Sequence, residues 1–309
     1  MGSARDTLAT FTLGTLPNLD VVVLGALELF AATELPPLPH LSRPLVLGSA
    51  GALAAARAVF ADKAAVFADE SSYQKWLTHT DMFDGVVILS ASGGKHAIEM
   101  AQAVAEAGMT SYLLTNNPTA AAAKFVSPEH IVVFPKNREP YTNNTSTYLG
   151  MILAASGESA TEIYEHITTK VDQALLRDFS CYSTYTFVVP KAFGPVAQLI
   201  RIKFEEMFEP MVHGRAYTEE EIKHAKTVIE SGDEIFISLD CDNVCHGCSK
   251  NRLCVPMPAH AGPAAAMAMG YYIVGKVQAA HPPYFKNNIE RYAKQASDMF
   301  GQDINPIVE

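Results

Sequence analysis

A loop of small, hydroxyl-bearing residues follows a short apolar stretch in the first half of the chain. Val86–Leu89 is entirely apolar and of strand length, and the loop after it reads SASGGK, with Ser90, Ser92, Gly93 and Lys95 as its chemically distinctive members. Hydroxyls and helix-start amides can converge on an anion there, and glycine lets the backbone approach it closely. The positive charge of Lys95 adds to the attraction for an anion. The loop therefore predicts a site for a phosphate, or for another anion such as a sulfonate.

The residues around this loop predict a strand, a turn, a helix and a second strand. After the loop, apolar residues recur at helical spacing until Gly108, and Tyr112–Leu114 forms the next apolar run. Leu45–Leu47, a glycine turn and an alanine-rich segment repeat the pattern upstream. Alternation of strands and helices predicts a doubly wound α/β layer with a parallel sheet. In the upstream turn, Ser49 is a candidate ligand residue, the alternative being a tight corner without a ligand.

The second half of the chain repeats this alternation. An amphipathic helix over about 161–176 precedes apolar strands at 186–189, 234–239 and 253–255, with helices predicted at 195–207 and 263–277. We therefore expect two α/β subdomains, one over residues 1–157 with an N-terminal lead-in and one over 158–309 with a C-terminal helix. Each is expected to be a flavodoxin-like, three-layer αβα arrangement around a parallel sheet.

The string from the Ser-x-Ser-Gly turn through the alanine-rich helix and Gly108 to Leu113-Leu114-Thr115-Asn116 resembles the SIS (sugar isomerase) domain family, whose members bind phosphosugars. The resemblance covers nearly the whole chain and implies a double-SIS fold. It implies that Ser49, Ser90, Ser92, Gly93 and Lys95 contact the substrate or its phosphate. The family usually has a threonine where this chain has Lys95.

The resemblance also implies where proton transfer occurs. An aldose and a ketose phosphate interconvert through an enediol when a base moves a proton between C1 and C2, and a histidine can open the sugar ring. The family has Lys-x-x-Glu on a helix and then Glu-x-x-His. Lys203 and Glu206 stand at i and i+3, and Glu221 with His224 follows, two residues farther on than in the family. Glu206 is thus the expected base, His224 the ring-opening group and Lys203 a stabilising ammonium.

Other interpretations of these residues stay open. Glu205 competes with Glu206 for the role of base, and His213 with His224 for that of ring-opening histidine. Glutamate-rich segments are also commonly solvated helix faces with intrahelical ion pairs, which is the structural alternative for both segments.

A cluster of polar residues precedes the next predicted helix. Glu139 is followed by Thr145 and Ser146, which are first of all candidate helix N-caps. The resemblance implies that they line the sugar pocket.

Four cysteines lie in one short segment that the SIS resemblance does not cover. Cys241, Cys245, Cys248 and Cys254 stand close enough in sequence to hold a structural zinc ion or an iron–sulfur cluster. The alternatives are buried free thiols, or a redox pair formed by Cys245 and Cys248. The expected isomerase chemistry requires no cofactor.

Composition narrows the class of partner. Of the 309 residues, 49% are hydrophobic and 18% charged, as in an ordinary globular protein. The net charge of −10 disfavours nucleic acid and anionic membranes as partners. We find no signal peptide or membrane span, and the clustered, odd number of cysteines favours the cytoplasm.

These features together predict a phosphosugar aldose–ketose isomerase of carbohydrate metabolism. A deglycase acting on a fructosamine 6-phosphate with the same residues is the first alternative. A non-catalytic sensor that binds sugar phosphates is an alternative of another class. The resemblance further implies a homodimer with shared active sites.

Overall fold

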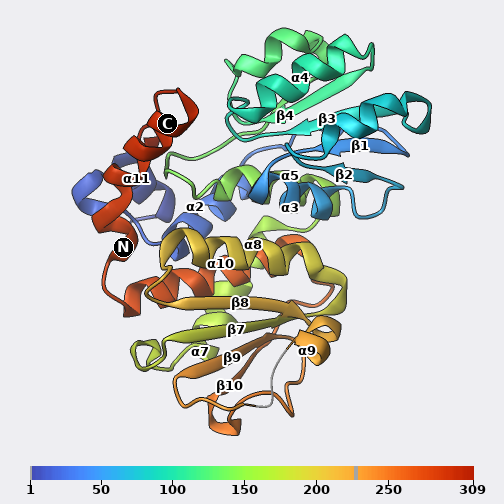
Figure 1. The fold of residues 1–309 in the computed structure, drawn as a ribbon. Coiled ribbons are helices and arrows are strands. Elements are labelled where there is room, and N and C mark those ends of the chain that lie inside the picture. Colours follow the sequence, from blue (N-terminus) through green and yellow to red (C-terminus); the bar gives the residue numbers. More distant parts are fainter. Residues whose placement is uncertain (1, 226–228) are drawn as a thin grey trace. The chain divides into compact units, whose positions relative to one another are not determined.

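The computed structural model describes residues 2–225 and 229–309, which divide into two compact units (Figure 1). Unit 1 comprises residues 1–32, 137–145 and 158–309, and unit 2 comprises residues 33–136 and 146–157. Residue 157, the predicted domain boundary, is one point at which the chain leaves unit 2. The N-terminal residues belong to the same unit as the second half of the chain.

Unit 2 is built on a five-stranded parallel sheet with the order β2-β1-β3-β4-β5. Its strands are short and largely apolar, which suits a sheet that is covered on both faces. They are β1 (Pro44–Leu47), β2 (Val66–Ala68), β3 (Gly85–Leu89), β4 (Ser111–Thr115) and β5 (Ile131–Val133). Its helices are α3 (Ala50–Val59), α4 (His96–Glu106) and α5 (Thr145–Ser156), the last beginning at the edge of unit 1, with 3₁₀ turns at Tyr73–Thr78, Thr80–Met82, Ala121–Phe125 and Pro128–His130.

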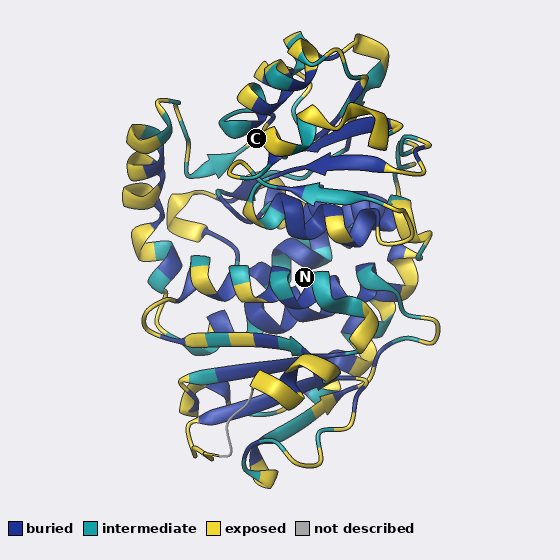
Figure 2. Cartoon of the chain, turned by 45° about the vertical axis from the view of Figure 1, so that its right-hand side comes forward, coloured by how far each residue is buried: buried dark blue, intermediate teal, exposed yellow. Residues whose placement is uncertain are grey.

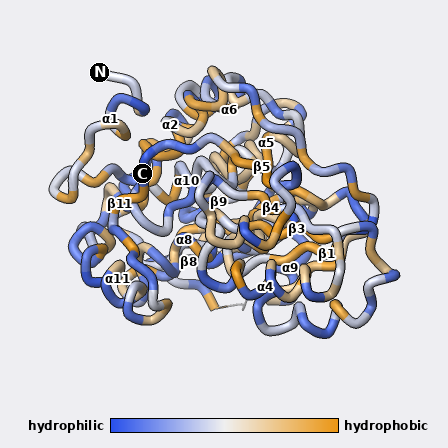
Figure 3. Tube along the Cα trace, turned by 90° about the horizontal axis from the view of Figure 1, so that it is seen from above, coloured by the Kyte–Doolittle hydropathy of each residue, from blue (hydrophilic) through white to orange (hydrophobic). Residues whose placement is uncertain are grey.

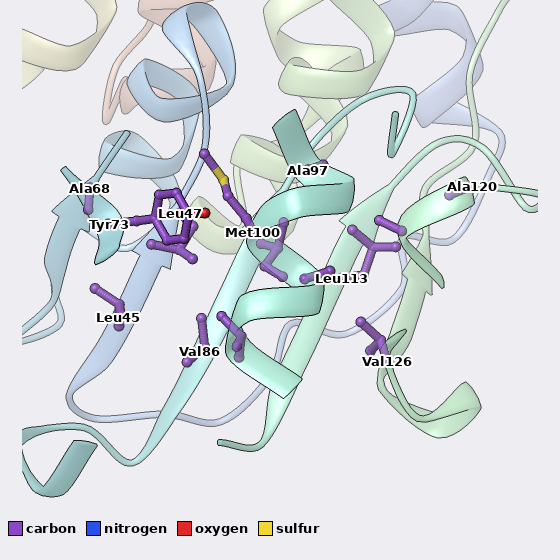
Figure 4. Close-up of a cluster of buried hydrophobic side chains, with 14 residues drawn as sticks. Leu45, Leu47, Ala68, Tyr73, Val86, Ala97, Met100, Leu113, Ala120 and Val126 are labelled. Carbon is purple, nitrogen blue, oxygen red and sulfur yellow. The ribbon is translucent and has the colours of Figure 1, made fainter. Parts of the chain in front are cut away.

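The core of unit 2 forms because alternate strand residues point to opposite faces of the sheet. Val86 and Ile88 of β3 pack toward Met100 and Val104 of α4 in one buried cluster (Figure 4). Val87, between them in sequence, is fully buried and belongs to the opposite face. Helix α3 contacts β1, β2 and β3. The sheet therefore has a helical layer on each face, as predicted.

Unit 1 contains a four-stranded parallel sheet with the order β10-β9-β7-β8. The strands are β7 (Thr184–Val189), β8 (His213–Thr218), β9 (Glu234–Leu239) and β10 (Arg252–Val255). The helices are α1 (Ala4–Thr10), α2 (Leu19–Ala31), α6 (Ala160–His166), a π-helical turn (Ile167–Val171), α7 (Asp172–Ala174), α8 (Gly194–Met207), α9 (Glu219–Ala225), α10 (Pro263–Ala280) and α11 (Tyr284–Phe300), with 3₁₀ turns at Leu13–Thr15, Phe179–Cys181, Lys191–Phe193 and Ser249–Asn251.

Apolar side chains of β7 pack against helices on both faces of this second sheet. Tyr185 and Phe187 of β7 contact Phe204 of α8, with ring centroids 5.7 and 5.8 Å away. Val188 points to the other face, where it packs with Ile222 of α9. Figure 2 shows buried central strands in both sheets, whereas the edge strands β2, β5, β8 and β10 are only partly buried. Figure 3 shows apolar residues along β3 and β4 and a mostly hydrophilic α11. The predicted pair of parallel-sheet α/β subdomains is confirmed.

The C-terminus of unit 1 is tied to the segment that follows residue 137. Strand β11 (Ile307–Val308) pairs antiparallel with β6 (Glu139–Pro140), and the Arg138 guanidinium lies 2.8 Å from the Glu309 side-chain carboxylate. This pairing holds the polar segment that precedes α5. Within the described residues, no helix has the length and hydrophobicity needed to span a bilayer.

The crossing of α2 and α10 predicts a position where only glycine fits. A Cβ on Gly275 would lie 2.0 Å from the Asp20 backbone nitrogen, whereas one on Gly270 of the same helix would meet only the Ile200 side chain, at 2.5 Å. Gly275→Ala should lower the free energy of unfolding by about 2 kcal/mol or more, because backbone cannot move aside as a side chain can. Urea denaturation measures this. Gly270→Ala is the matched control, and equal losses in the two variants would contradict the assigned contact.

Candidate active site

A buried ion pair on α8 forms the centre of the candidate site in unit 1. Lys203 is 2% exposed, and its Nζ donates to Glu206 Oε2 at 2.6 Å. The two residues are one helical turn apart, so their side chains share a face. Glu206 keeps 24% of its side chain exposed. The pair therefore joins a buried cation to a carboxylate that solvent can reach.

Thr142 completes the hydrogen bonding of this pair. Its carbonyl accepts a second bond from Lys203 Nζ at 2.6 Å, and its hydroxyl donates to Glu206 Oε1 at 2.7 Å. The φ angle of Thr142 is +73°, a conformation that costs a β-branched residue on the order of 1–3 kcal/mol. The ammonium on its carbonyl helps to hold that conformation. Both oxygens of Glu206 are consequently fixed in direction.

Two tyrosines lie beside this carboxylate. The rings of Tyr141 and Tyr292 are 5.5 Å apart, and Tyr292 comes from α11. Burial raises the pKa of both phenols, and the charge of Glu206 raises the pKa further in each case. Both tyrosines therefore stay neutral at physiological pH and can donate hydrogen bonds.

The structure distinguishes Glu206 from its neighbour. Glu205, the preceding residue of α8, is exposed and lies 3.7 Å from Arg201. It has the geometry of a solvated surface ion pair. Glu206 is the carboxylate that the fold orients.

The two candidate histidines are both at the surface. His224 is exposed on α9, and no hydrogen bond or ion pair among residues 2–225 and 229–309 joins it to Glu206. Glu221, the first residue of the Glu-x-x-His motif, caps the start of α9 by accepting from the Thr218 amide at 2.8 Å. His213 lies 3.1 Å from Glu209 and is also exposed. The predicted role of His224 stays a prediction.

The polar segment before α5 is buried and partly used in capping. Glu139 is 4% exposed and accepts a hydrogen bond from the Thr145 amide at 2.7 Å, at the first residue of α5. Thr145 Oγ1 is buried and, within the described residues, has no hydrogen-bond partner. Ser146 is also buried. Glu139, which was not among the predicted N-caps, thus accepts the hydrogen bond at the start of α5. The predicted contact of these residues with a sugar is untested.

The predicted anion loop lies after β3 in unit 2. The Ser90 and Ser92 hydroxyls accept from the amides of Gly93 and Gly94, at 3.1 and 3.3 Å, which leaves each hydroxyl proton free to be donated outward. Gly93 has φ +60°, and a Cβ there would lie 2.4 Å from Ala120 Cβ. Half-buried Lys95 begins α4, with φ +51°. The loop is thus fixed by its own residues.

Ser49 lies at the same edge of the sheet as this loop. It precedes α3, makes no side-chain capping bond, and follows β1, the parallel neighbour of β3. The strand order 2-1-3-4-5 changes direction between β1 and β3, which is where open parallel sheets bind their ligands. Both loops therefore follow the two strands that flank this change of direction.

The four cysteines do not form the predicted metal site, which is a correction. Cys241 Sγ donates to the Val188 carbonyl at 3.4 Å, and Cys248 Sγ to Glu230 Oε2 at 3.5 Å, while Cys245 and Cys254 are exposed. Burial raises the pKa of the Cys241 thiol to about 12. Among residues 2–225 and 229–309, no group of three or more His, Cys, Asp or Glu is arranged to hold a metal ion.

An arginine organises the cysteine-containing loop instead. The Arg252 guanidinium donates to the carbonyls of Val244, His246 and Gly247 at 2.6 to 3.2 Å. The guanidinium thus binds three carbonyls of this loop. Neither a zinc ion nor an iron–sulfur cluster is needed to shape it.

Three residues of the site were not predicted from sequence. Thr142, Tyr141 and Tyr292 contact or surround Glu206, although they come from a loop and a helix far from α8 in sequence. Thr142 belongs to no motif, and it contributes a backbone carbonyl as well as its hydroxyl. A tyrosine on the amphipathic C-terminal helix gives no signal of its own.

Several solved structures are similar to this chain, whereas no protein-family model and no curated protein sequence matches it. The C-terminal domain of glucosamine-fructose-6-phosphate aminotransferase from Francisella tularensis is 14% identical over 92% of this chain and 93% of its own, with a TM-score of 0.56. Glucosamine-6-phosphate deaminase from Thermotoga maritima is 12% identical over 90% and 94%, with a TM-score of 0.54.

A candidate phosphosugar isomerase from Clostridium difficile 630 gives a TM-score of 0.55 at 10% identity, over 94% of this chain and 98% of its own. These structures share the fold of this chain. The double-SIS arrangement predicted from the sequence is thereby confirmed for the fold, while such low identity leaves activity and substrate to be proposed.

The buried pair makes a prediction for stability. Lys203→Met should lower the free energy of unfolding by about 3 kcal/mol, because the Glu206 carboxylate and the Thr142 carbonyl both lose their cationic partner. Adding Glu206→Gln should restore part of this loss, since no uncompensated carboxylate then remains. Chemical denaturation measures both variants. Lys223→Met, which breaks an exposed pair at the same spacing, is the control and should leave the midpoint unchanged.

Proposed function

We propose that this chain is a phosphosugar aldose–ketose isomerase in which Glu206 moves a proton between C1 and C2 of the sugar through an enediol. The observation that carries the proposal is the fixed carboxylate of Glu206, bound by buried Lys203 and by the Thr142 hydroxyl. It occurs in a chain whose fold is shared with structures described as a glucosamine-fructose-6-phosphate aminotransferase domain and a glucosamine-6-phosphate deaminase.

The geometry of Glu206 suits a base that must serve two carbons. A carboxylate can take a proton from C1 and return it to C2 when both carbons lie within reach of one oxygen. Two directed hydrogen bonds stop its rotation, so that it does not need to reorganise during the reaction. The ammonium of Lys203 adds a fixed positive charge beside the place where the enediolate forms.

The loop Ser90–Lys95 is the proposed phosphate site. Its two hydroxyl protons are available for donation, and Lys95 supplies a positive charge in a chain whose net charge is −10. A phosphate is therefore recognised by local geometry and not by the overall field of the protein. A sulfonate would bind to the same donors, so a binding experiment must distinguish a sulfonate from a phosphate.

His224 is the proposed ring-opening group, acting in the active site of a second subunit. It is exposed and lies outside the hydrogen-bond network of Glu206 in its own chain. A homodimer in which each active site contains residues of both subunits would place His224 of one subunit in the site of the other. Localisation in the cytoplasm is part of the same proposal.

A deglycase acting on a fructosamine 6-phosphate is the second candidate. It is favoured by the similarity to structures described as a glucosamine-6-phosphate deaminase and a glucosamine-fructose-6-phosphate aminotransferase. In that reaction the same proton transfer at C1 and C2 accompanies the departure of an amine. The two candidates differ in the substrate that turns over.

Proton NMR in D₂O with hexose 6-phosphates and 6-phosphofructosamines tests the proposal. Deuterium appearing at C1 or C2 is expected for the substrate, and it identifies the substrate class. Glu206→Gln should abolish turnover by removing the base and yet leave stabilisation by the ligand intact. Glu205→Gln is the matched control and should retain activity. If the wild type stabilises with a phosphosugar but exchanges no proton, the protein is a sensor and the isomerase proposal fails.

The proposed phosphate site makes a separate prediction. Thermal stabilisation by the phosphosugar, about 2.7 kcal/mol at a hundred times its Kd, should disappear in Ser92→Ala combined with Lys95→Ala. Differential scanning calorimetry measures the shift. Ser71→Ala combined with Lys75→Ala, in the same unit but outside the loop, is the control. Unchanged stabilisation in the loop variant would place the anion elsewhere.

A further inference from the structure

One half-buried arginine joins three segments of unit 1. Arg138 Nε lies 2.8 Å from Glu309 Oε1, directly after β11, and Arg138 Nη1 donates to the Phe11 carbonyl at the end of α1. The guanidinium also lies 4.4 Å from the centre of the Phe11 ring, a cation–π distance. Phe11 is buried and offers a fixed support. Arg138 therefore ties the residue before β6 to both the end of α1 and the residue after β11.

The backbone on both sides of Thr142 is held by hydrogen bonds. Strand β6 pairs with β11 shortly before Thr142 in sequence. The Tyr141 amide donates to the Pro306 carbonyl at 2.8 Å. On the other side, the Asn143 amide donates to the Pro140 carbonyl at 3.2 Å. These bonds are independent of the ion pair on α8, so they form a second support for Thr142.

This support matters because of the conformation of Thr142. Its φ of +73° is unfavourable for a β-branched residue and persists only where the surroundings impose it. The Thr142 carbonyl accepts from Lys203 at 2.6 Å, and its hydroxyl donates to Glu206 at 2.7 Å. Because φ turns the carbonyl and the hydroxyl together about the N–Cα bond, their directions depend on where the preceding residues are held.

We propose, on the basis of the function proposed above, that Arg138 is a positioning residue for the base Glu206. It acts through Thr142. The arginine fixes β6, β6 fixes the direction of the Thr142 hydroxyl, and the hydroxyl fixes Oε1 of the carboxylate. Lys203 holds the other oxygen, Oε2. With Oε1 released, the carboxylate can rotate, and a base that must reach both C1 and C2 is misplaced.

The exposure of this ion pair separates positioning from global stabilisation. The Glu309 side chain is 77% exposed, and ion pairs with so much solvent contact contribute little to the free energy of unfolding. A small displacement of a catalytic group, by contrast, can slow a reaction by about a hundred-fold. We therefore expect the loss of Arg138 to affect kcat far more than the midpoint of urea denaturation.

Steady-state kinetics with the substrate identified by NMR test this assignment. Arg138→Met should lower kcat by about ten-fold or more and change KM by less than about two-fold, because the base is misplaced while the substrate contacts remain. Arg201→Met, which breaks an exposed ion pair on α8, is the matched control and should keep the wild-type kcat. An unchanged kcat in Arg138→Met, with or without a higher KM, overturns the assignment.

A double variant tests the route through Thr142. Thr142→Val keeps the shape of the side chain and removes the hydroxyl. If Arg138 acts through that hydroxyl, adding Arg138→Met to Thr142→Val should lower kcat by less than about two-fold more, whereas independent defects multiply. Multiplied losses would contradict the route and leave the proposed function standing.

Glu309→Gln, which weakens the same tie, takes the place of Arg138→Met in both measurements if that variant does not fold. Absence of turnover in the wild type with every phosphosugar overturns the proposed function, and the role of Arg138 with it.

Discussion

The candidate site depends on the burial of one ammonium group. Lys203 is among the largest fully buried side chains, and a buried lysine is tolerated only when its charge is compensated. Glu206 supplies the charge and the Thr142 carbonyl a further acceptor. The Lys203 Nζ also lies 5.6 Å from the centre of the Tyr271 ring, a contact that favours a cation. Stability and the proposed function therefore depend on the same pair, because the cation that must be neutralised fixes the carboxylate that we propose as the base.

The strained loop that meets this cation is anchored from the C-terminus. Thr142 sits in a conformation unfavourable for threonine, and such a residue persists only where its surroundings over-determine it. The Tyr141 amide donates to the Pro306 carbonyl at 2.8 Å, and β11 pairs with β6 directly before it. The last residues of the chain thus hold the loop on one side while Lys203 holds it on the other. Tyr292, on α11, belongs to the same C-terminal region.

Features that depend on residues close together in the sequence could be predicted, whereas contacts made by the tertiary fold could not. Strand β9 was predicted over its observed range because all six of its residues are buried. Strand β8, with the sequence HGRAYT, was not predicted, because it lies at the edge of the sheet and only part of it is buried. Lys203 and Glu206 were predicted together because one helical turn joins them. Thr142 and Tyr292 were not, because only the tertiary fold brings them to α8.

The cysteine segment shows the opposite kind of error. Close spacing makes a shared metal feasible, but it does not determine which way the thiols point. The residue that hydrogen-bonds most of the loop is Arg252, which lies between the last two cysteines in sequence and donates to three carbonyls. One arginine can bind several carbonyls because its five donors lie in a fixed plane. Such an interaction has no signature in the spacing of cysteines.

The two sheets have related strand orders but different chemistry at their ligand edges. In unit 1 the order reverses between β7 and β9, as it does between β1 and β3 in unit 2. The loops after β1 and β3 are small and hydroxyl-rich, whereas the loop after β9 carries Asp240 and Cys241 and is shaped further on by Arg252. The topology thus supplies a candidate ligand position in each unit, and the loops at the two positions differ in charge and in hydroxyl content.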